Sequence, residues 1–228
     1  MSRCVAMNAW EKIRSAADCL VNTFDGSVYN QLNERYLHHA FSSLVKHEMG
    51  LDYRGYDRDG KLWLHPEWPT FKKIAGLGLA KYRKTEGDGY RPCEITSRQH
   101  RGGLIDFAVG EYVRPIIGIE FSFAIGWKRP IVEFDLLKLF DNRTPFECVL
   151  SLNFVLRPNG FAGGGGLVKF EAGIQNAAKN ASSRLADMKY TADRPCHRAD
   201  IRIIEVHNDK NRQWVLDSSR WHFVRRNW

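Results

Sequence analysis

The chain has 228 residues, of which 43% are hydrophobic, and its 34 Lys and Arg against 26 Asp and Glu give a formal charge of +8. This is enough apolar content to close one substantial core, but no run reaches the ~18 to 20 apolar residues that a membrane-spanning helix needs. The first ten residues, MSRCVAMNAW, also lack the basic and apolar segments of a secretion signal, so we expect a cytoplasmic protein with no membrane partner.

Two amphipathic helices are predicted near the N-terminus. Apolar residues recur at intervals of three and four in 8–24 and again in 27–49, where Ser27 can serve as an N-cap and Gly50 as a stop. Residues 51–100 are rich in Gly, Pro, Asp and charge. We expect this stretch to be irregular apart from one helix near 69–84.

From residue 103 onward the pattern changes to strands separated by helices. Strands are predicted at 103–109, 115–124, 147–156, 199–207 and 212–219, and helices at 130–142 and 167–190. The first two strands lie close enough in sequence to form an antiparallel hairpin, whereas the two helices imply crossovers and parallel pairing. We therefore expect an α/β fold with a mixed central β-sheet flanked by helices.

This core is expected to occupy residues 101–228 and to end in a basic, aromatic tail. Residues 1–100 would pack their helices and irregular basic segment on it, so that the whole forms one compact domain. Five widely spaced cysteines show no CxxC pair and no zinc-like spacing, which is typical of reduced core thiols.

The positive charge favours a polyanion such as nucleic acid, although it would also suit an anionic membrane surface or aid solubility. Basic residues gather in 83–101, in 194–202 and in 218–228, where aromatic residues alternate with arginine as they do in many nucleic-acid grooves. Each cluster is equally compatible with an ordinary solvated surface. Charge alone therefore does not identify a partner.

Two acidic residues interrupt apolar runs in the first two predicted core strands. Alternation puts Asp106 on the face that carries Leu104 and Ala108, and Glu120 on the face of Ser122, opposite aliphatic and aromatic side chains. In a hairpin the two carboxylates would share one face, and burying both would be costly without a cation between them. A divalent ion such as Mg²⁺ fits this requirement.

Simpler partners for these carboxylates also exist in the sequence. Asp106 could cap a turn or pair with Arg101 or Arg114. Glu120 could pair with Lys128 or Arg129.

The pattern resembles the PD-(D/E)XK nuclease superfamily, whose members include many restriction and repair enzymes. The resemblance is carried by Ile105-Asp106, by the IEFS segment at 119–122 and by the FDLLKLF helix that follows. It implies a restriction-endonuclease-like αβββαβ core, built from the helix at 27–49 and from 103–208. It also implies that Asp106 and Glu120 bind Mg²⁺, with Mn²⁺ as a substitute.

Ser122 stands where the family has the lysine that positions the attacking water, and serine cannot supply that charge. Lys138, on the following helix, is the best replacement, with Lys128 behind it, although an ion pair of Lys138 with Asp135 is an ordinary alternative. The family often adds a helix glutamate to the metal site, which maps onto Glu34. His38 lies four residues later on the same helix face, and both residues could also be simply solvated.

The resemblance therefore implies a Mg²⁺-dependent endonuclease that hydrolyses phosphodiester bonds, in DNA or in RNA, in a restriction or repair setting. Asp106, Glu120 and Lys138 would act at the metal, with Ser122 at most hydrogen bonding nearby, and a homodimer would suit a duplex target. The phosphate backbone would lie against basic side chains, namely Arg98, Arg101, Arg194 and Arg198. The alternative is a catalytically inactive protein of the same fold that binds nucleic acid or a protein partner.

Overall fold

We describe the protein from a computed structural model, which defines residues 3–23, 34–69, 104–112, 114–141, 144, 146–157, 165–187, 198–206 and 212–226. The helices in these ranges are α1 (Arg3–Thr23), α2 (Glu34–Met49), α3 (Arg129–Phe140) and α4 (Gly165–Asp187). The strands are β1 (Leu64–Pro69), β2 (Leu104–Glu111), β3 (Arg114–Ile125), β4 (Cys148–Leu156), β5 (Arg198–Val206), β6 (Arg212–Asp217) and β7 (His222–Arg226). None of the helices in the described part of the chain is both long and apolar enough to cross a membrane.

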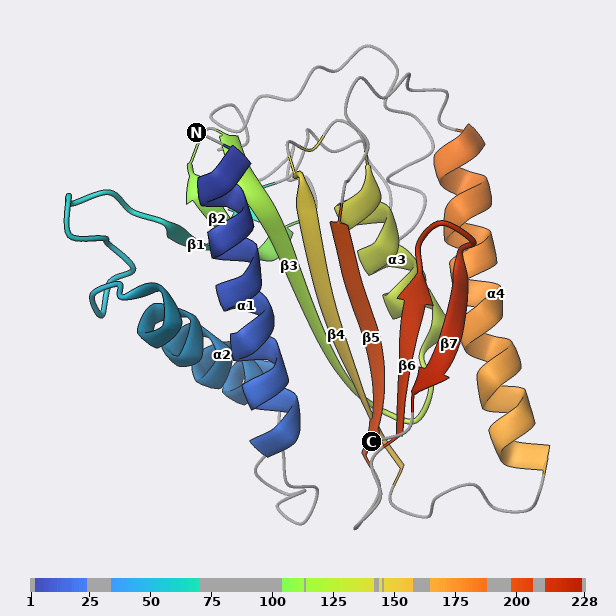
Figure 1. The fold of residues 1–228 in the computed structure, drawn as a ribbon. Coiled ribbons are helices and arrows are strands. Elements are labelled where there is room, and N and C mark those ends of the chain that lie inside the picture. The colour runs from blue at the N-terminus through green and yellow to red at the C-terminus, as the bar shows by residue number, and fades with distance from the viewer. Residues whose placement is uncertain are drawn as a thin grey trace, which may run out of the picture.

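The strands form one mixed sheet of seven strands in the order β1 to β7 (Figure 1). β3, β4 and β5 are parallel, and every other neighbouring pair is antiparallel. The predicted mixed sheet, the β2–β3 hairpin and the parallel pairing are therefore confirmed. α3 and α4 are the crossover helices that parallel neighbours require.

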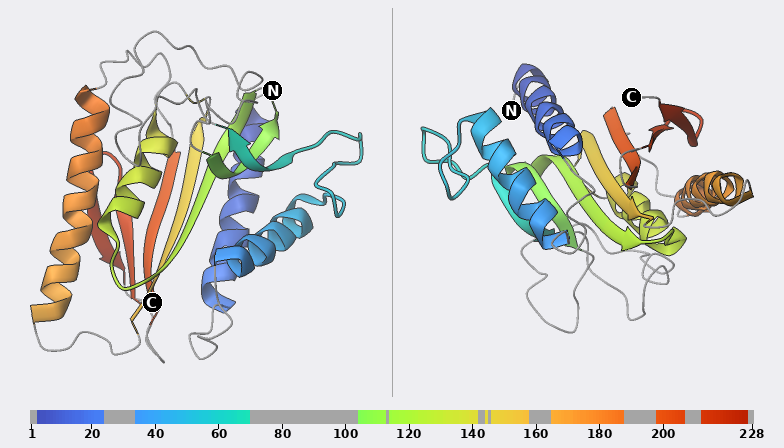
Figure 2. Two further views of the ribbon diagram at one scale, coloured as in Figure 1. Left: turned by 180° about the vertical axis from the view of Figure 1, so that it is seen from behind. Right: turned by 90° about the horizontal axis from the view of Figure 1, so that it is seen from below.

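The helices cover the sheet from both sides (Figure 2). One hydrophobic layer joins α1 and α2 to β3 residues such as Ile117, Ile119 and Phe121. A second layer joins α3 and α4 to the opposite face, where Ala108 and Val149 lie. All of β4 is buried, as expected for a parallel strand at the centre of a sheet.

Two strands, β1 and β7, lie where no strand was predicted. β1 contains Pro66 and Pro69, which disfavour a strand in general but are tolerated at the sheet edge, and β1 pairs with only β2. The buried Trp68 indole anchors this edge by donating to the carbonyl of Tyr112 at 2.9 Å. At the other edge, the predicted basic tail contains β7, which pairs with β6. The helix predicted at 69–84 lies outside the described residues.

Candidate metal centre

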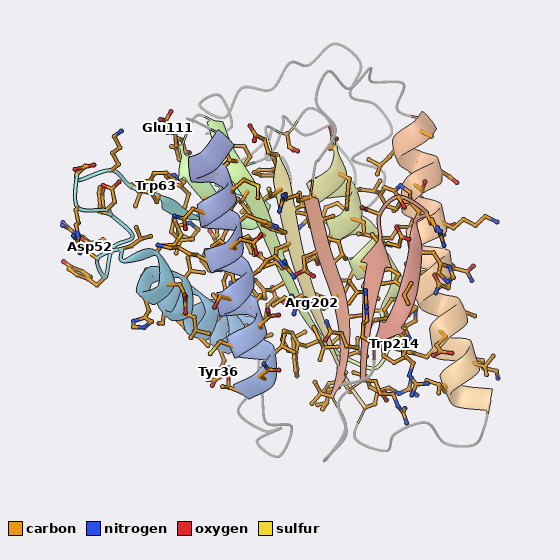
Figure 3. The ribbon with its side chains drawn as sticks, viewed as in Figure 1. Tyr36, Asp52, Trp63, Glu111, Arg202 and Trp214 are labelled. Carbon is orange, nitrogen blue, oxygen red and sulfur yellow. The ribbon has the colours of Figure 1, made fainter. Side chains whose placement is uncertain are left out.

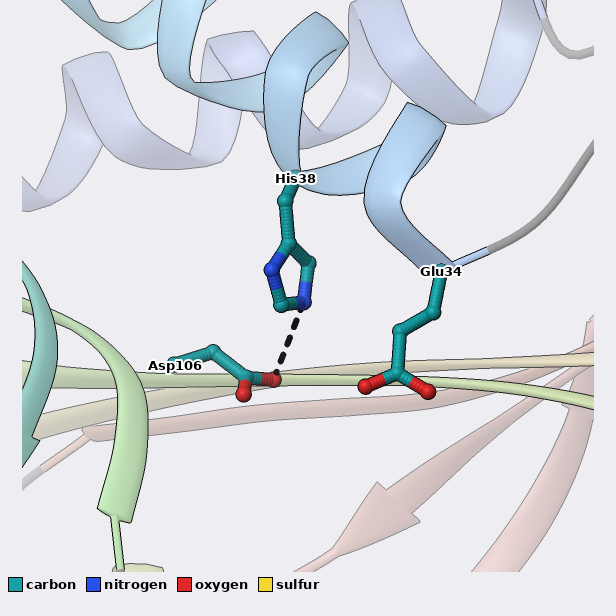
Figure 4. A group of neighbouring side chains, drawn as sticks. All are labelled: Glu34, His38 and Asp106. Atoms are coloured by element: carbon teal, nitrogen blue, oxygen red, sulfur yellow. Dashed lines mark ion pairs between the residues drawn. The ribbon is translucent and has the colours of Figure 1, made fainter.

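Two polar side chains of α2 face the sheet at the point where β2 passes beneath the helix. α2 buries Leu37, Phe41 and Val45 against the sheet, which fixes the rotation of the helix about its axis. Glu34 and His38 are one turn apart, so they project to the same side of α2. The helix packing therefore positions both residues above β2 (Figure 4).

Asp106 of β2 completes this group. Its Oδ2 atom lies 3.5 Å from Nε2 of His38, and the same oxygen accepts a hydrogen bond of 2.6 Å from the backbone N–H of Phe121 on β3. Ligand atoms of Glu34, His38 and Asp106 all lie within 4.8 Å of one another. Two carboxylates and an imidazole at this separation can hold one metal ion.

Asp106 does not lie in a regular strand position, and the predicted alternation fails there. Phe107 and Val109 pack towards α1 and α2 as a pair, but Ile105 packs with Ala108 on the opposite side. The adjacent β1 strand is irregular at the same level, because Glu67 has a φ of 49°. The Asp106 carboxylate instead contacts His38 of α2 and the backbone N–H of Phe121 on β3.

Glu120 lies on the opposite side of the sheet from His38, so the prediction that both carboxylates share one face is wrong. Glu120 is only 1% exposed, and its Oε1 atom lies 2.5 Å from Nζ of Lys138 on α3. Lys138 also pairs with Asp135 at 3.1 Å and donates to the carbonyl of Leu104 at 3.2 Å. The ion pair of Lys138 with Asp135, predicted as the ordinary alternative, is therefore present.

The charges of these groups influence one another across the sheet. Burial raises the pKa of Glu120, Lys138 opposes this shift, and the Asp106 carboxylate adds to it. Burial likewise raises the pKa of Asp135 to about 6, again against the attraction of Lys138. Burial lowers the pKa of Lys138, but Glu120 and Asp135 outweigh it, so that the net shift is upward and the ammonium stays charged.

Neighbouring charges also shift pKa values on the α2 side of the metal centre. The Asp106 carboxylate raises the pKa of His38 in spite of partial burial. Burial and the nearby Asp106 raise the pKa of Glu34, while His38 and Lys138 lower it. The carboxylates of Asp106 and Glu120 are therefore within electrostatic reach although they approach from different faces.

Ser122 belongs to a separate buried network. Its hydroxyl donates to Oδ1 of Asn153 at 2.7 Å, and Nδ2 of Asn153 donates to the hydroxyl of Ser151 at 2.8 Å. The first of these bonds joins β3 to β4, and the second lies within β4. The side chain that replaces the expected lysine thus contributes to the sheet interior rather than to the group around Asp106.

The predicted nucleic-acid contacts are largely outside the described residues, where Arg98, Arg101 and Arg194 fall. Arg198, at the start of β5, lies 3.4 Å from Glu11 of α1, so it helps to dock α1 on the sheet. Lys128 precedes α3 and is exposed.

The prediction missed a basic pocket beside the Asp106 group. This pocket, of about 430 Å³, is lined along α2 by Arg35, His38, His39, Ser42 and Lys46, by Arg54 of the following loop, and by Leu64, Pro66, Glu67, Asp106 and Phe107. The spacing of its α2 residues, at intervals of three and four, was present in the sequence as the polar face of an amphipathic helix. That face alone does not reveal that it borders an acidic group on β2.

Comparison with known proteins gives no relative for this chain, because no family model, curated protein or solved structure matches it.

Proposed function

We propose that this protein is a metal-dependent nuclease that hydrolyses phosphodiester bonds, with DNA as its principal substrate. One observation carries the proposal. Glu34, His38 and Asp106 converge within ligand distance of one another, on the border of a basic pocket and within electrostatic reach of the buried Glu120–Lys138 pair.

The donor set fits a divalent ion. Glu34, His38 and Asp106 would hold the ion. Glu120 would not be a ligand, but its carboxylate lies within electrostatic reach of Asp106. A carboxylate pair suits Mg²⁺ or Mn²⁺, and the imidazole shifts the preference towards Mn²⁺ because Mg²⁺ binds nitrogen ligands poorly. When bound, such an ion would polarise the scissile phosphate and lower the pKa of a coordinated water.

The surrounding residues restrain these ligands. The N–H of Phe121 fixes one oxygen of Asp106, and Lys138 holds Glu120 in one position on the other side of the sheet. Lys138 would bring to the site, from α3, the positive charge that the resemblance expects at position 122. A fixed ammonium near developing phosphate charge stabilises a transition state without reorganising.

The order of elements supports the same proposal. In the described residues from α2 to β4 the elements are a helix, three strands in antiparallel neighbour pairs, a helix and a parallel strand. This order is compatible with the αβββαβ core that the resemblance implies, with β1 as the first of the three strands in place of a segment assigned from the sequence.

A second candidate function is binding without hydrolysis. Lys138 has three N–H donors, and oxygens of Glu120, Asp135 and Leu104 lie within reach of all three. An ammonium engaged in this way has no donor left for a water, and Ser122 carries no charge. This arrangement favours a protein that binds nucleic acid with an incomplete catalytic apparatus.

Cleavage of a DNA panel distinguishes the two candidates. The panel contains plasmid, linear duplex and single-stranded DNA, incubated with Mg²⁺, Mn²⁺ or EDTA and with wild type or Asp106→Asn. Asparagine keeps an oxygen for the N–H of Phe121 but removes the charge. We expect metal-dependent cleavage that Asp106→Asn abolishes. Salt-sensitive binding without cleavage in any metal would instead support the second candidate.

A further inference from the structure

The polar face of α2 carries a line of nitrogen-rich side chains that the metal centre does not use. Arg35, His39 and Lys46 lie on the same face as His38, at helical spacing, and all of them border the pocket. At a rise of about 1.5 Å per residue, Arg35 and Lys46 are roughly 16 Å apart along the helix axis. The line is thus long enough to follow several phosphates.

The loop after α2 extends this line beyond the end of the helix. Figure 3 shows Tyr36 near one end of α2 and Asp52 in the loop beyond the other end. Lys46 donates to the carbonyl of Tyr53 at 2.8 Å, which ties the loop to the helix. Asp52 accepts from the backbone N–H of Arg54 at 2.8 Å and of Tyr56 at 2.9 Å, so the turn is held in one shape.

This turn displays an aromatic ring beside a guanidinium. Tyr53 is 81% exposed, the largest exposed fraction of any large hydrophobic side chain in the described ranges. The Arg54 guanidinium carbon lies 5.4 Å from the Tyr53 ring centroid and 5.2 Å from that of Tyr56. Exposed rings with neighbouring arginines are surfaces on which unpaired bases stack.

We propose that this surface, which we call the α2 groove (Arg35, His39, Ser42, Lys46, Tyr53 and Arg54), binds a single strand of nucleic acid. The phosphates lie along Arg35, His39 and Lys46, and a base stacks on Tyr53, so that the strand reaches the Asp106 group at the other end. The inference rests on the proposed function, because it assigns the substrate of that site.

The charge and the size of the α2 groove favour a single strand of nucleic acid over a free phosphate or a duplex. A polyanion is needed to match cations spread along the helix, whereas one free phosphate would engage only one or two of them. A pocket of about 430 Å³ has room for a unit of nucleotide size rather than for a double helix. A duplex also hides the base faces that Tyr53 could contact.

The test is equilibrium binding of the full-length wild-type chain in EDTA, where no metal-dependent cleavage occurs. Fluorescence anisotropy follows a labelled single-stranded oligonucleotide and the same sequence as a duplex, over a range of salt concentrations. The variants are Arg35→Gln, Lys46→Gln and Tyr53→Ala. The controls are Lys169→Gln and Lys179→Gln, two exposed lysines of α4 on the other side of the sheet.

We expect the single strand to bind more tightly than the duplex. Arg35→Gln and Lys46→Gln should weaken binding and reduce the slope of log K against log salt by about 0.7 for each lost phosphate contact. Tyr53→Ala should weaken single-strand binding by about 5-fold or more with the slope unchanged, since it removes stacking and no charge. Arg35 lies far from the loop, so its result does not depend on loop position.

Three outcomes would overturn the proposal that the α2 groove binds a single strand. The first is tighter binding of the duplex together with no effect of Tyr53→Ala. The second is wild-type affinity and salt slope in both Arg35→Gln and Lys46→Gln, and the third is an equal loss of affinity in the α4 controls. None of these depends on hydrolysis. A protein that binds as expected but never cleaves would refute the nuclease alone, and a protein that cleaves without using these residues would refute the groove alone.

Discussion

Lys138 carries the positive charge that lets two carboxylates share the interior between β3 and α3. Its Nζ atom lies 2.5 Å from Glu120 and 3.1 Å from Asp135, and all three side chains are buried. Two buried carboxylates left without a cation must either stay charged at high cost or take up protons. The effect of removing the lysine is therefore large and predictable.

Lys138→Met should lower the free energy of unfolding by about 3 to 5 kcal/mol at neutral pH, measured by urea denaturation. The matched control replaces all three charges, as Lys138→Met with Glu120→Leu and Asp135→Leu, and should recover most of that loss because no unpaired charge remains. A loss below about 1 kcal/mol in the single variant would contradict the buried ion-pair account.

The buried His65 of β1 should make a pH-dependent contribution to stability. Its Nε2 atom lies 2.8 Å from the carbonyl oxygen of Gly110, to which it donates, and burial lowers the pKa of the imidazole below its ordinary 6.5. The folded state then binds fewer protons than the unfolded state. His65 therefore contributes stability above about pH 6.5, and this contribution is lost as the pH falls towards the folded pKa.

The raised pKa values of Asp135 and His38 act in the opposite direction, but they affect wild type and His65→Gln alike. The urea midpoint of wild type relative to that of His65→Gln should therefore fall as the pH decreases from about 7 to 5. Glutamine keeps an N–H for the Gly110 carbonyl but does not titrate. Parallel pH profiles of the two proteins would mean that His65 does not cause the dependence.

At the level of elements, β3 is packed tightly against the segment that leads into β4. A Cβ atom added at Gly118 would lie 2.6 Å from ring atoms of Phe146, which is too close for any carbon contact. Gly118→Ala should therefore destabilise the fold by about 1 to 3 kcal/mol. Shortening the neighbour, as Gly118→Ala with Phe146→Leu, should cost less than the sum of the two single changes, as a thermal double-mutant cycle would measure. Strict additivity would argue against this contact.

The elements that the sequence predicted well are those with a strong apolar signal. β3 and β4 are long apolar runs, α2 and α4 have clear helical spacing, and the helices between strands require parallel pairing. β1 escaped prediction because Pro66 and Pro69 break the usual strand pattern, and only its position at the sheet edge makes them acceptable. β7 was not predicted because its basic residues leave too few apolar positions to show the strand pattern.

The sequence named all three residues of the group around Asp106, namely Glu34, His38 and Asp106. It also predicted Glu120 beside Asp106, but Glu120 pairs with Lys138 of α3 instead. The direction of the Asp106 carboxylate was not predicted, because it is set by contacts with the backbone N–H of Phe121 and with His38 that the sequence does not reveal. Strict alternation therefore placed Asp106 on the same face as Glu120, although it turns towards α2.

At the scale of the whole molecule, the sheet separates two layers that contribute different parts of one site. The α2 layer provides Glu34, His38 and the basic groove, and the α3 layer provides Lys138 and Asp135. Asp106 lies at the gap between β2 and β3, where the two layers come into electrostatic reach. The proposed function thus requires the sheet to hold the two layers together.

The most direct test of the account is a calorimetric titration of Mn²⁺ into the full-length protein, because the central claim is that Glu34, His38 and Asp106 are arranged for a divalent ion. We predict one site in wild type, lost in Asp106→Asn and retained in the control Asp59→Asn, which removes an exposed carboxylate of the loop after α2. Binding that is absent in wild type, or unchanged in Asp106→Asn, would contradict the claim.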